Sequence, residues 1–190
     1  GCLLVKLISL KPWVNNIDVI VPVPDSSMPF ALGVQHILNK QLHQGLIKNT
    51  YIERTFIMQN EKLIKKNVKR KINANHNVLC GKNVLIIDDS IVRGNTSRHI
   101  VSLTKSACAK SVYFASGAPP ILFPNHYGIY IPTKNELIAS GRKIQDVADI
   151  IGAQEIVYND LNHILHSLKK NNDKIEDFEI SMFENRDLIF

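Results

Sequence analysis

The segment VLIIDDSIVRGNTS, from Val84 to Ser97, constrains the fold and the function of this chain more than any other. Its four leading apolar residues predict a buried strand, and two adjacent acids, Asp88 and Asp89, follow directly. Ligands of an open parallel sheet bind at the carboxyl ends of its strands, so these acids lie where a site is expected. Two neighbouring carboxylates repel each other unless a cation or hydroxyl donors lie between them. The pair therefore predicts a magnesium ion or a sugar diol.

The loop after the acids predicts a second ligand group. Gly94 permits a tight turn, and Asn95, Thr96 and Ser97 offer side-chain donors where a helix begins. The free backbone amides at the start of a helix also favour a phosphate. A diol or metal site beside a phosphate site is typical of a protein that binds a sugar phosphate.

The same segment permits two other interpretations. One is an ordinary turn in which Asn95 or Thr96 caps the helix, and this alternative stays open. The other is a response-regulator receiver, which also carries a strand ending in DDS. A receiver needs a further aspartate two strands later, but no aspartate occurs between Asp89 and Asp146. A receiver also carries its acid pair near its start, so we reject this interpretation.

The chain as a whole predicts an α/β domain with a central, mainly parallel sheet flanked by helices. Short apolar runs alternate with longer segments of helical period, which indicates parallel strands joined by helices. With 190 residues, 45% of them hydrophobic, we expect residues 1–190 to form a single domain. The expected strands are Ile17–Val23, Val84–Asp88, Ser111–Ser116 and Glu155–Tyr158, with a weaker one near Leu46. The expected helices are Pro29–Leu42, Thr96–Lys105, Ile144–Ile151 and Leu161–Lys170, and residues 119–140 are expected to be irregular.

Six motifs in order resemble the type I phosphoribosyltransferases, and among them the amidophosphoribosyltransferase family. Besides the acid-containing segment, the motifs are VIVPVPDSSMPFALG, YIERTFI, NVKRKINAN, ASGAPPILFPNHYGI and ELIASGR. The resemblance implies the type I phosphoribosyltransferase fold, phosphoribosyl pyrophosphate (PRPP) as substrate and Mg²⁺ as cofactor. It also implies homo-oligomers and inhibition by purine nucleotides.

The resemblance assigns roles to individual residues. Asp88 and Asp89 would be the catalytic pair that holds the ribose hydroxyls and, together with Ser26, the magnesium ion. Many relatives carry threonine at the position of Ser26. From the residues alone, Ser26 or Ser27 caps the following helix equally well. Ser26 is also implied to bind the substrate. The other implied substrate-binding residues are Asp25, Ser27, Ser90, Arg93, Gly94, Asn95, Thr96, Ser97, Lys69 and Arg70.

A basic run occupies residues 61–71, where six lysines and arginines face one glutamate and account for +5 of the net charge of +6. The rest of the chain is nearly neutral, which argues against a nucleic-acid partner. Because the charges recur at spacings of three and four, a solvated helix face is one interpretation. The resemblance implies instead that Tyr51–Asn75 is a flexible loop that closes over PRPP and excludes water.

Several other residues carry weaker signals. Three widely spaced cysteines, Cys2, Cys80 and Cys108, form no C-x-x-C pair, so neither a disulfide framework nor a zinc or iron–sulfur site is signalled and a reduced, cytoplasmic setting is expected. No apolar run approaches the roughly 18 residues of a membrane span. His163 and His166 are expected to be surface or core histidines. The resemblance implies nucleotide contact for Lys48, but an ordinary surface lysine is the preferred interpretation.

The family's glutaminase domain has no counterpart that we recognise in this sequence. Its nucleophile is an amino-terminal cysteine that works with its own free amine. Cys2 follows Gly1 and lacks that amine, so we expect it to be a buried helix residue. The segment FEISMFENRD has no cysteine for the iron–sulfur cluster of some relatives. We therefore expect a phosphoribosyltransferase-domain fragment without the glutaminase domain.

The expected reaction is displacement of pyrophosphate from PRPP by ammonia, which gives phosphoribosylamine in the first step of de novo purine synthesis. Two alternatives stay open. A purine-base salvage phosphoribosyltransferase would need a purine pocket. A non-catalytic PRPP sensor that controls transcription would need a DNA-binding helix-turn-helix, and the first residues of this sequence show none.

Overall fold

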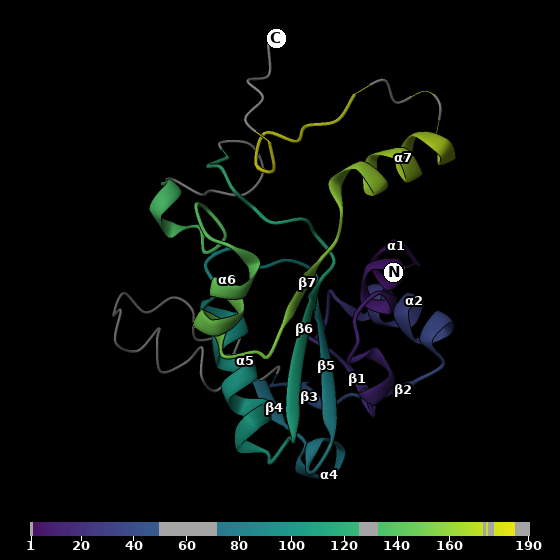
Figure 1. Cartoon of the computed structure of the whole chain (residues 1–190), viewed down its shortest axis with the longest axis vertical. Coiled ribbons are helices and arrows are strands. Elements are labelled where there is room, and N and C mark those ends of the chain that lie inside the picture. Colours follow the sequence, from purple (N-terminus) through teal and green to yellow (C-terminus); the bar gives the residue numbers. More distant parts are fainter. Residues whose placement is uncertain (1, 50–71, 126–132, 173, 175–176, 185–190) are drawn as a thin grey trace.

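The computed structural model describes residues 2–49, 72–125, 133–172, 174 and 177–184 (Figure 1). Within these residues, a five-stranded parallel sheet forms the centre of the fold. Its strands are β1 (Val19–Pro22), β2 (Gln41–Leu42), β5 (Asn83–Asp88), β6 (Ser111–Ser116) and β7 (Ile156–Tyr158), in the spatial order β2-β1-β5-β6-β7. The predicted α/β class and its parallel sheet are confirmed.

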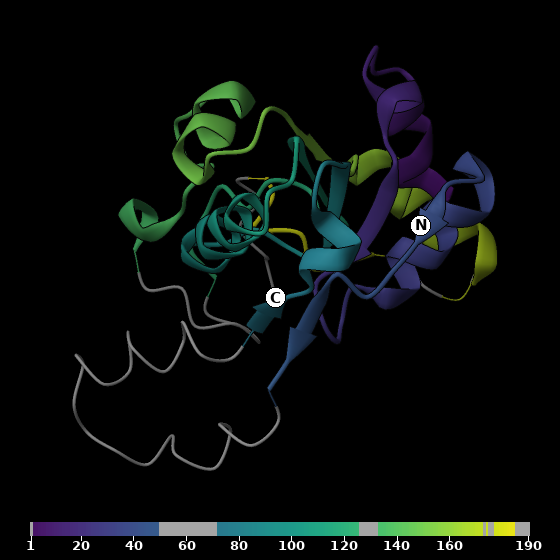
Figure 2. The same cartoon turned by 90° about the horizontal axis from the view of Figure 1, so that it is seen from below.

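Helices cover both faces of this sheet, as the view from below in Figure 2 shows. Helices α1 (Cys2–Ser9) and α2 (Met28–Leu38) pack on one face, and α5 (Asn95–Ser106) and α6 (Ile144–Ile151) pack on the other. The remaining helical elements in the described part of the chain are α4 (His76–Leu79), α7 (Leu161–Asn171) and two short 3₁₀ turns, Val14–Asn16 and Lys134–Glu136. A separate antiparallel pair joins β3 (Leu46–Lys48) to β4 (Ile72–Ala74).

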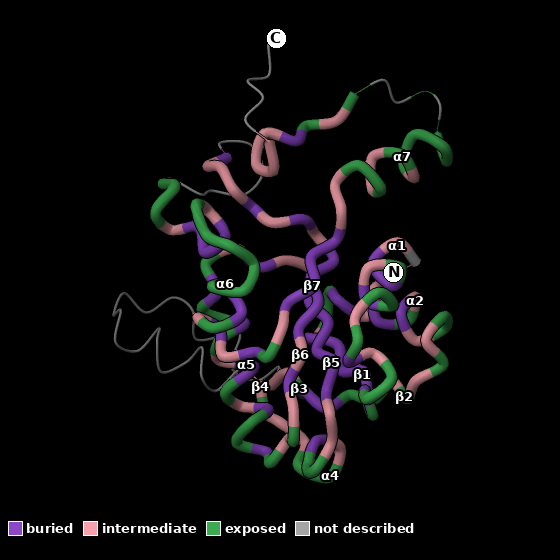
Figure 3. The backbone as a smooth tube through the Cα atoms, in the orientation of Figure 1, coloured by how far each residue is buried: buried purple, intermediate pink, exposed green. Residues whose placement is uncertain are grey.

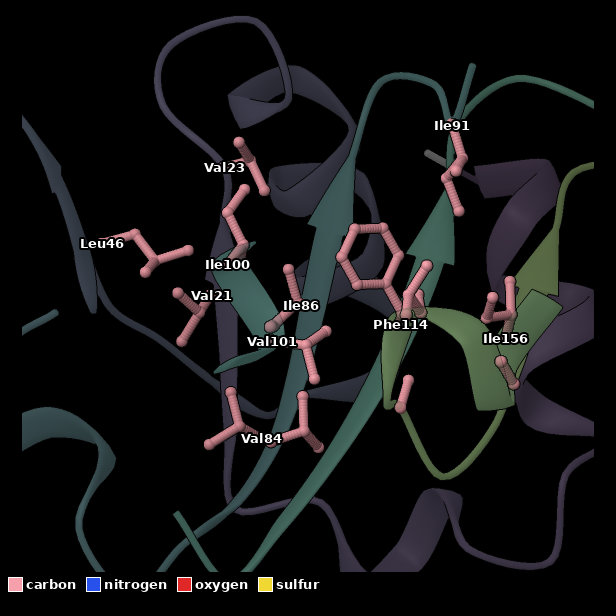
Figure 4. Close-up of a cluster of buried hydrophobic side chains, with 14 of the residues drawn as sticks. Val21, Val23, Leu46, Val84, Ile86, Ile91, Ile100, Val101, Phe114 and Ile156 are labelled. Carbon is pink, nitrogen blue, oxygen red and sulfur yellow. The ribbon is translucent and has the colours of Figure 1, made fainter. Parts of the chain in front are cut away.

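The alternation of side chains along the strands explains why helices cover both faces. In β5, Val84 and Ile86 belong to the core on the α5 and α6 face, while Leu85 and Ile87 belong to the core on the α1 and α2 face. All four are fully buried, as expected for a central parallel strand. Figure 3 shows the buried centre of the sheet, and Figure 4 shows the α5-side core around Val84, Ile86 and Phe114. Packing on both faces of β5 therefore fixes the position of Asp88, the last residue of this strand.

Two expectations about the elements were wrong. The helix expected over Pro29–Leu42 ends at Leu38, because Asn39 adopts a left-handed conformation with φ of 50°, and Gln41–Leu42 then pairs with β1. The weaker strand expected near Leu46, by contrast, is confirmed as β3, which lies outside the main sheet. Ile72–Ala74, expected to belong to a flexible loop, forms β4, and the rest of the predicted closing loop, 51–71, lies outside the described residues.

The single tryptophan joins the start of the chain to β7. Trp13 is buried, and its ring stacks on Tyr113 with centroids 4.2 Å apart. Its indole N–H donates to Glu155 Oε2 at 2.6 Å, and Lys11 Nζ donates to Glu155 Oε1. Glu155 directly precedes β7, so this contact connects segments more than 140 residues apart.

Replacing Glu155 with alanine is expected to lower the free energy of unfolding by about 1 to 3 kcal/mol, because the indole N–H and the Lys11 ammonium lose their acceptor in a partly buried place. Urea titration followed by Trp13 fluorescence measures the change. Glu155→Gln is the matched control, since it retains an acceptor and is expected to lose less. Equal stability of Glu155→Ala and the parent protein would contradict the prediction.

Candidate functional site

The candidate site lies where the topology of the sheet changes direction. Strand β1 has β2 on one side and β5 on the other, so the chain leaves β1 and β5 toward opposite edges of the sheet. Ligands of open α/β sheets bind in the crevice outside the carboxyl ends of such strands. A cavity of about 510 Å³ lies there, within the range typical of small-molecule sites. Of the predicted site residues, it is lined by Ser26, Asp88, Asp89, Ser90, Arg93, Gly94, Asn95, Thr96 and Ser97.

The two acids enter this cavity from the end of β5. Asp88 is only 6% exposed, and its Oδ1 accepts a hydrogen bond from the backbone N–H of Asp89 at 2.9 Å. Ser90 Oγ donates to Asp89 Oδ1 at 3.2 Å. The backbone carbonyls of Asp88 and Asp89 accept from Gly117 and Ala118 at 2.8 and 2.7 Å, which fixes the acids against the loop after β6.

Burial raises the pKa of Asp88 from 3.8 to about 7, and the neighbouring Asp89 charge adds to the rise. The site thus disfavours two negative charges when it is empty, and a divalent cation would offset both. Asp88, Asp89 and the Ser26 hydroxyl line the same cavity and offer only oxygen donors, the ligand type that magnesium prefers. The donor chemistry of these residues therefore fits magnesium.

The half of the site that is predicted to bind phosphate is the loop that leads into α5. Gly94 is the residue before the helix and has φ of 73°, while Asn95 is the first helical residue. The interpretation in which an Asn95 or Thr96 side chain caps α5 is therefore wrong. Instead, Asn95 and Thr96 are exposed at the cavity, and Ser97 is buried but also lines it. The backbone amides of the first turn of α5 are available to an anion at this place.

Ile138 supports this loop from outside the sequence motif. A Cβ atom on Gly94 would lie 2.2 Å from Ile138 Cδ1, so the close approach requires glycine. Two hydrogen bonds hold Ile138, because its N–H donates to the Val92 carbonyl at 2.9 Å and its carbonyl accepts from Arg142 at 3.0 Å. Sequence reasoning did not identify Ile138, although it lies in the ELIASGR motif.

Arg93 lines the cavity and also forms an ion pair with Glu136. Its Nη2 forms an ion pair with Glu136 Oε2 at 2.6 Å, and the side chain is half exposed. Thr133 Oγ1 also donates to Glu136, on the oxygen Oε1, at 3.2 Å. Arg93 is thus tied to the 3₁₀ turn that precedes Ile138.

Two predicted substrate-binding residues lie away from this cavity. Ser27 is fully buried, and its hydroxyl donates to the Val23 carbonyl at 2.5 Å instead of capping α2 or facing a ligand. Asp25 lines a neighbouring cavity of about 370 Å³ and accepts from Lys48 Nζ at 3.1 Å. Lys48 lines the same cavity, and its contact with a nucleotide stays a prediction. Lys69 and Arg70 lie outside the described residues.

The remaining sequence candidates lie elsewhere. His163 and His166 are exposed on α7, which confirms the surface interpretation, and His163 Nδ1 lies 3.7 Å from Asp160 Oδ1. Cys2 begins α1 as expected, but its side chain lies outside the described residues. Among the described residues, no helix is long and apolar enough to cross a membrane.

A paired-acid site beside a phosphate loop, at the switch point of a parallel sheet, is the arrangement that defines a phosphoribosyltransferase domain. Comparison with protein families agrees, since the family model described as the phosphoribosyl transferase domain matches residues 4–118. The chain belongs to this family.

The relatives that it resembles are amidophosphoribosyltransferases, as the motifs predicted. The chain is 47% identical to the enzyme of Pasteurella multocida over 175 residues, 47% identical to that of Escherichia coli over 174, and 42% identical to that of Saccharomyces cerevisiae over 174. These matches cover 91%, 91% and 92% of this chain but only 35%, 34% and 33% of the relatives, so the chain spans about a third of their length.

Solved structures agree with these relatives. The glutamine phosphoribosylpyrophosphate amidotransferase from Bacillus subtilis, complexed with ADP and GMP, superposes with a TM-score of 0.78 at 35% identity. The match covers 96% of this chain and 40% of that one. A second structure, of the allosteric regulatory enzyme of purine biosynthesis, gives the same TM-score and identity.

Proposed function

We propose that this chain carries the PRPP site of an amidophosphoribosyltransferase, at which ammonia displaces pyrophosphate to give 5-phosphoribosylamine. The observation that supports it most is one cavity that is lined both by Asp88 and Asp89 and by the loop Gly94–Ser97. This pairing fits a ligand that carries a sugar diol and phosphate groups. The identity to amidophosphoribosyltransferases, 47% over 175 residues in one case, favours ammonia over a purine base as the acceptor.

The residues divide the work in this proposal. Asp88 and Asp89 hold the ribose hydroxyls and place negative charge beside the cation-like sugar of the transition state. The amides of the first α5 turn, with Thr96 and Ser97, hold the 5-phosphate. Asp88, Asp89 and Ser26 would hold a magnesium ion, which would supply positive charge to offset that of the leaving pyrophosphate. The nitrogen lone pair of ammonia forms the new bond to the anomeric carbon as the bond to pyrophosphate breaks, and the surplus proton leaves to solvent.

The test measures pyrophosphate release with ammonia, glutamine, hypoxanthine and adenine in parallel. We expect release with ammonia, faster at higher pH because the nucleophile is unprotonated ammonia, and none with glutamine. Turnover with a purine base but not with ammonia would establish the salvage alternative. Magnesium-dependent PRPP binding without turnover of any acceptor would favour the sensor alternative. Failure to bind PRPP would overturn all three.

We further propose that the protein works as a homo-oligomer in the cytoplasm and that purine nucleotides inhibit it. The free thiols Cys80 and Cys108 are compatible with a reducing compartment. A structural relative is complexed with ADP and GMP. The cavity around Asp25 and Lys48 is the candidate for such a nucleotide, since it adjoins the PRPP cavity through Val23 and Pro24. Lys48→Ala is then expected to weaken inhibition by GMP and to leave PRPP binding unchanged in calorimetric titration.

A further inference from the structure

A second cluster of reactive side chains lies at the opposite end of the sheet from the PRPP cavity. His76, Cys80 and Cys108 are all exposed, and their ligand atoms, one imidazole nitrogen and two sulfurs, lie within 4.8 Å of one another. His76 and Cys80 come from α4 and its carboxyl end, and Cys108 comes from the turn between α5 and β6. Figure 1 shows α4 below the amino ends of the strands, whereas Asp88 ends β5 at the other edge.

The backbone holds the three residues in fixed register. The N–H of Cys80 donates to the His76 carbonyl at 2.9 Å, so the two side chains lie on the same side of one helical turn. The N–H of Gly81 donates to the Cys108 carbonyl at 2.8 Å. The cysteines are 28 positions apart in the sequence, so their proximity depends on this contact between the two turns.

Cys108 also occupies an unusual backbone conformation. Its φ is 62°, and among the described non-glycine residues it shares a positive φ only with Asn39. Asparagine tolerates this region well, but cysteine rarely adopts it. A strained residue that carries a metal-binding group is the kind of observation from which a function is inferred.

We propose that His76, Cys80 and Cys108 form a binding site for zinc or a similar thiolate-binding divalent ion. Two sulfurs and one imidazole are ligands that zinc prefers, and a water molecule would take the fourth tetrahedral position. Zinc–sulfur bonds of about 2.3 Å place tetrahedral ligand atoms roughly 3.8 Å apart, so binding would draw the three exposed side chains together by at most about 1 Å. Both thiols would lose their protons to solvent on binding.

This site is independent of the proposed transferase activity. Its ligands lie at the amino end of β5, and the PRPP cavity lies at the carboxyl end, about 17 Å along a six-residue strand. None of the three residues lines the PRPP cavity. Loss of the metal site is therefore expected to leave magnesium-dependent PRPP binding unchanged.

The test is titration of the purified, untagged and reduced chain with Co²⁺, which reports thiolate ligation by an intense charge-transfer absorption. We expect one equivalent of Co²⁺ per chain, displacement by Zn²⁺, and a higher melting temperature with Zn²⁺. Cys80→Ser and Cys108→Gly are expected to abolish the thiolate absorption and to weaken Zn²⁺ binding at least about a hundredfold, more than the loss of an outer-shell partner costs. Glycine suits the φ of Cys108, so Cys108→Gly is expected to fold at least as well as the parent chain.

Cys2→Ser and His163→Gln are the matched controls, because they remove a thiol and an exposed histidine outside the cluster. Both are expected to bind Co²⁺ as the parent chain does. Thiolate absorption that survives in Cys80→Ser and Cys108→Gly would overturn the proposal. So would the absence of that absorption in the parent chain, or a Cys80–Cys108 disulfide that forms in the presence of Zn²⁺ and shows as a mass two hydrogens lower.

Discussion

Replacing Asp88 with asparagine is expected to stabilise the metal-free protein at alkaline pH. Burial raises the pKa of Asp88 to about 7, against 3.8 for the ordinary group. Between these two pH values, Asp88 keeps its proton in the folded protein and releases it in the unfolded chain. The stability of the parent protein therefore falls as pH rises from about 4 to about 7. The asparagine side chain does not titrate in this range. The free energy of unfolding of the variant is therefore expected to exceed that of the parent protein by about 2 to 4 kcal/mol at pH 8 and by little near pH 4.

The same substitution is expected to weaken magnesium-dependent PRPP binding by about 1.5 to 3 kcal/mol, because a charge-assisted contact is lost. Urea unfolding in excess chelator at the two pH values measures stability, and calorimetry with magnesium measures binding. For the parent protein, PRPP binding is expected to strengthen between pH 6 and pH 8, since Asp88 must release its proton to hold the cation.

Asp89→Asn is the matched control for this prediction. Asp89 is less buried than Asp88, so its replacement is expected to weaken PRPP binding without an equal gain in stability. If the parent protein bound PRPP equally well with magnesium and in excess chelator, the role of both acids in holding magnesium would be contradicted. If the Asp88→Asn variant were less stable than the parent protein at pH 8, the negative charge of the buried Asp88 carboxylate would not destabilise the folded protein as its raised pKa implies.

Replacing Gly94 with alanine is expected to destabilise the protein by about 2 to 4 kcal/mol and to abolish measurable PRPP binding. Alanine at φ of 73° costs about 1 to 2 kcal/mol in itself. In addition, its Cβ would lie 2.2 Å from Ile138 Cδ1, so the loop or Ile138 must move. Movement of the loop displaces the backbone amides that open into the cavity, and PRPP titration together with urea unfolding measures the effects on binding and on stability.

A double-mutant cycle with Ile138→Val separates the two causes. Valine lacks Cδ1, and the next nearest atom, Cγ1 of Ile138, would lie 3.3 Å from the new Cβ. Ile138→Val alone is expected to cost about 1 kcal/mol. In the double variant the collision is removed, so the two losses are expected to be less than additive. Strict additivity would mean that backbone strain at Gly94 accounts for the whole effect.

The central sheet and half of the site were predictable because they depend on local signals. Buried parallel strands are continuous apolar runs, and Asp88 and Asp89 follow such a run directly. Two short strands, β2 and β4, were not predictable in this way. Gln41–Leu42 continues the helical pattern of α2, and only the pairing with β1 makes it a strand. Ile72–Ala74 follows the basic run and depends on pairing with Leu46–Lys48.

The rest of the site depends on contacts between distant residues, which a motif does not contain. Ile138 acts on Gly94 from 44 positions away, and Glu136 pairs with Arg93 from 43 positions away. Ser27 follows Ser26 directly, yet its hydroxyl points into the protein toward Val23. Because the side chains of these two neighbouring residues point in different directions, sequence order alone did not show that Ser26 lines the cavity and that Ser27 is buried.

The contact between Gly94 and Ile138 also has a consequence for the order in which the protein is made. A ribosome adds Ile138 fifty residues after Asp88, a delay of several seconds at ordinary rates of synthesis. Until then, β1 and β5 can pair, but the phosphate loop has no support behind it. We therefore expect a nascent chain to gain little stability from PRPP, the proposed ligand, before this late segment emerges. PRPP would stabilise only those chains whose synthesis has passed that point, and it would not assist the early stages of folding.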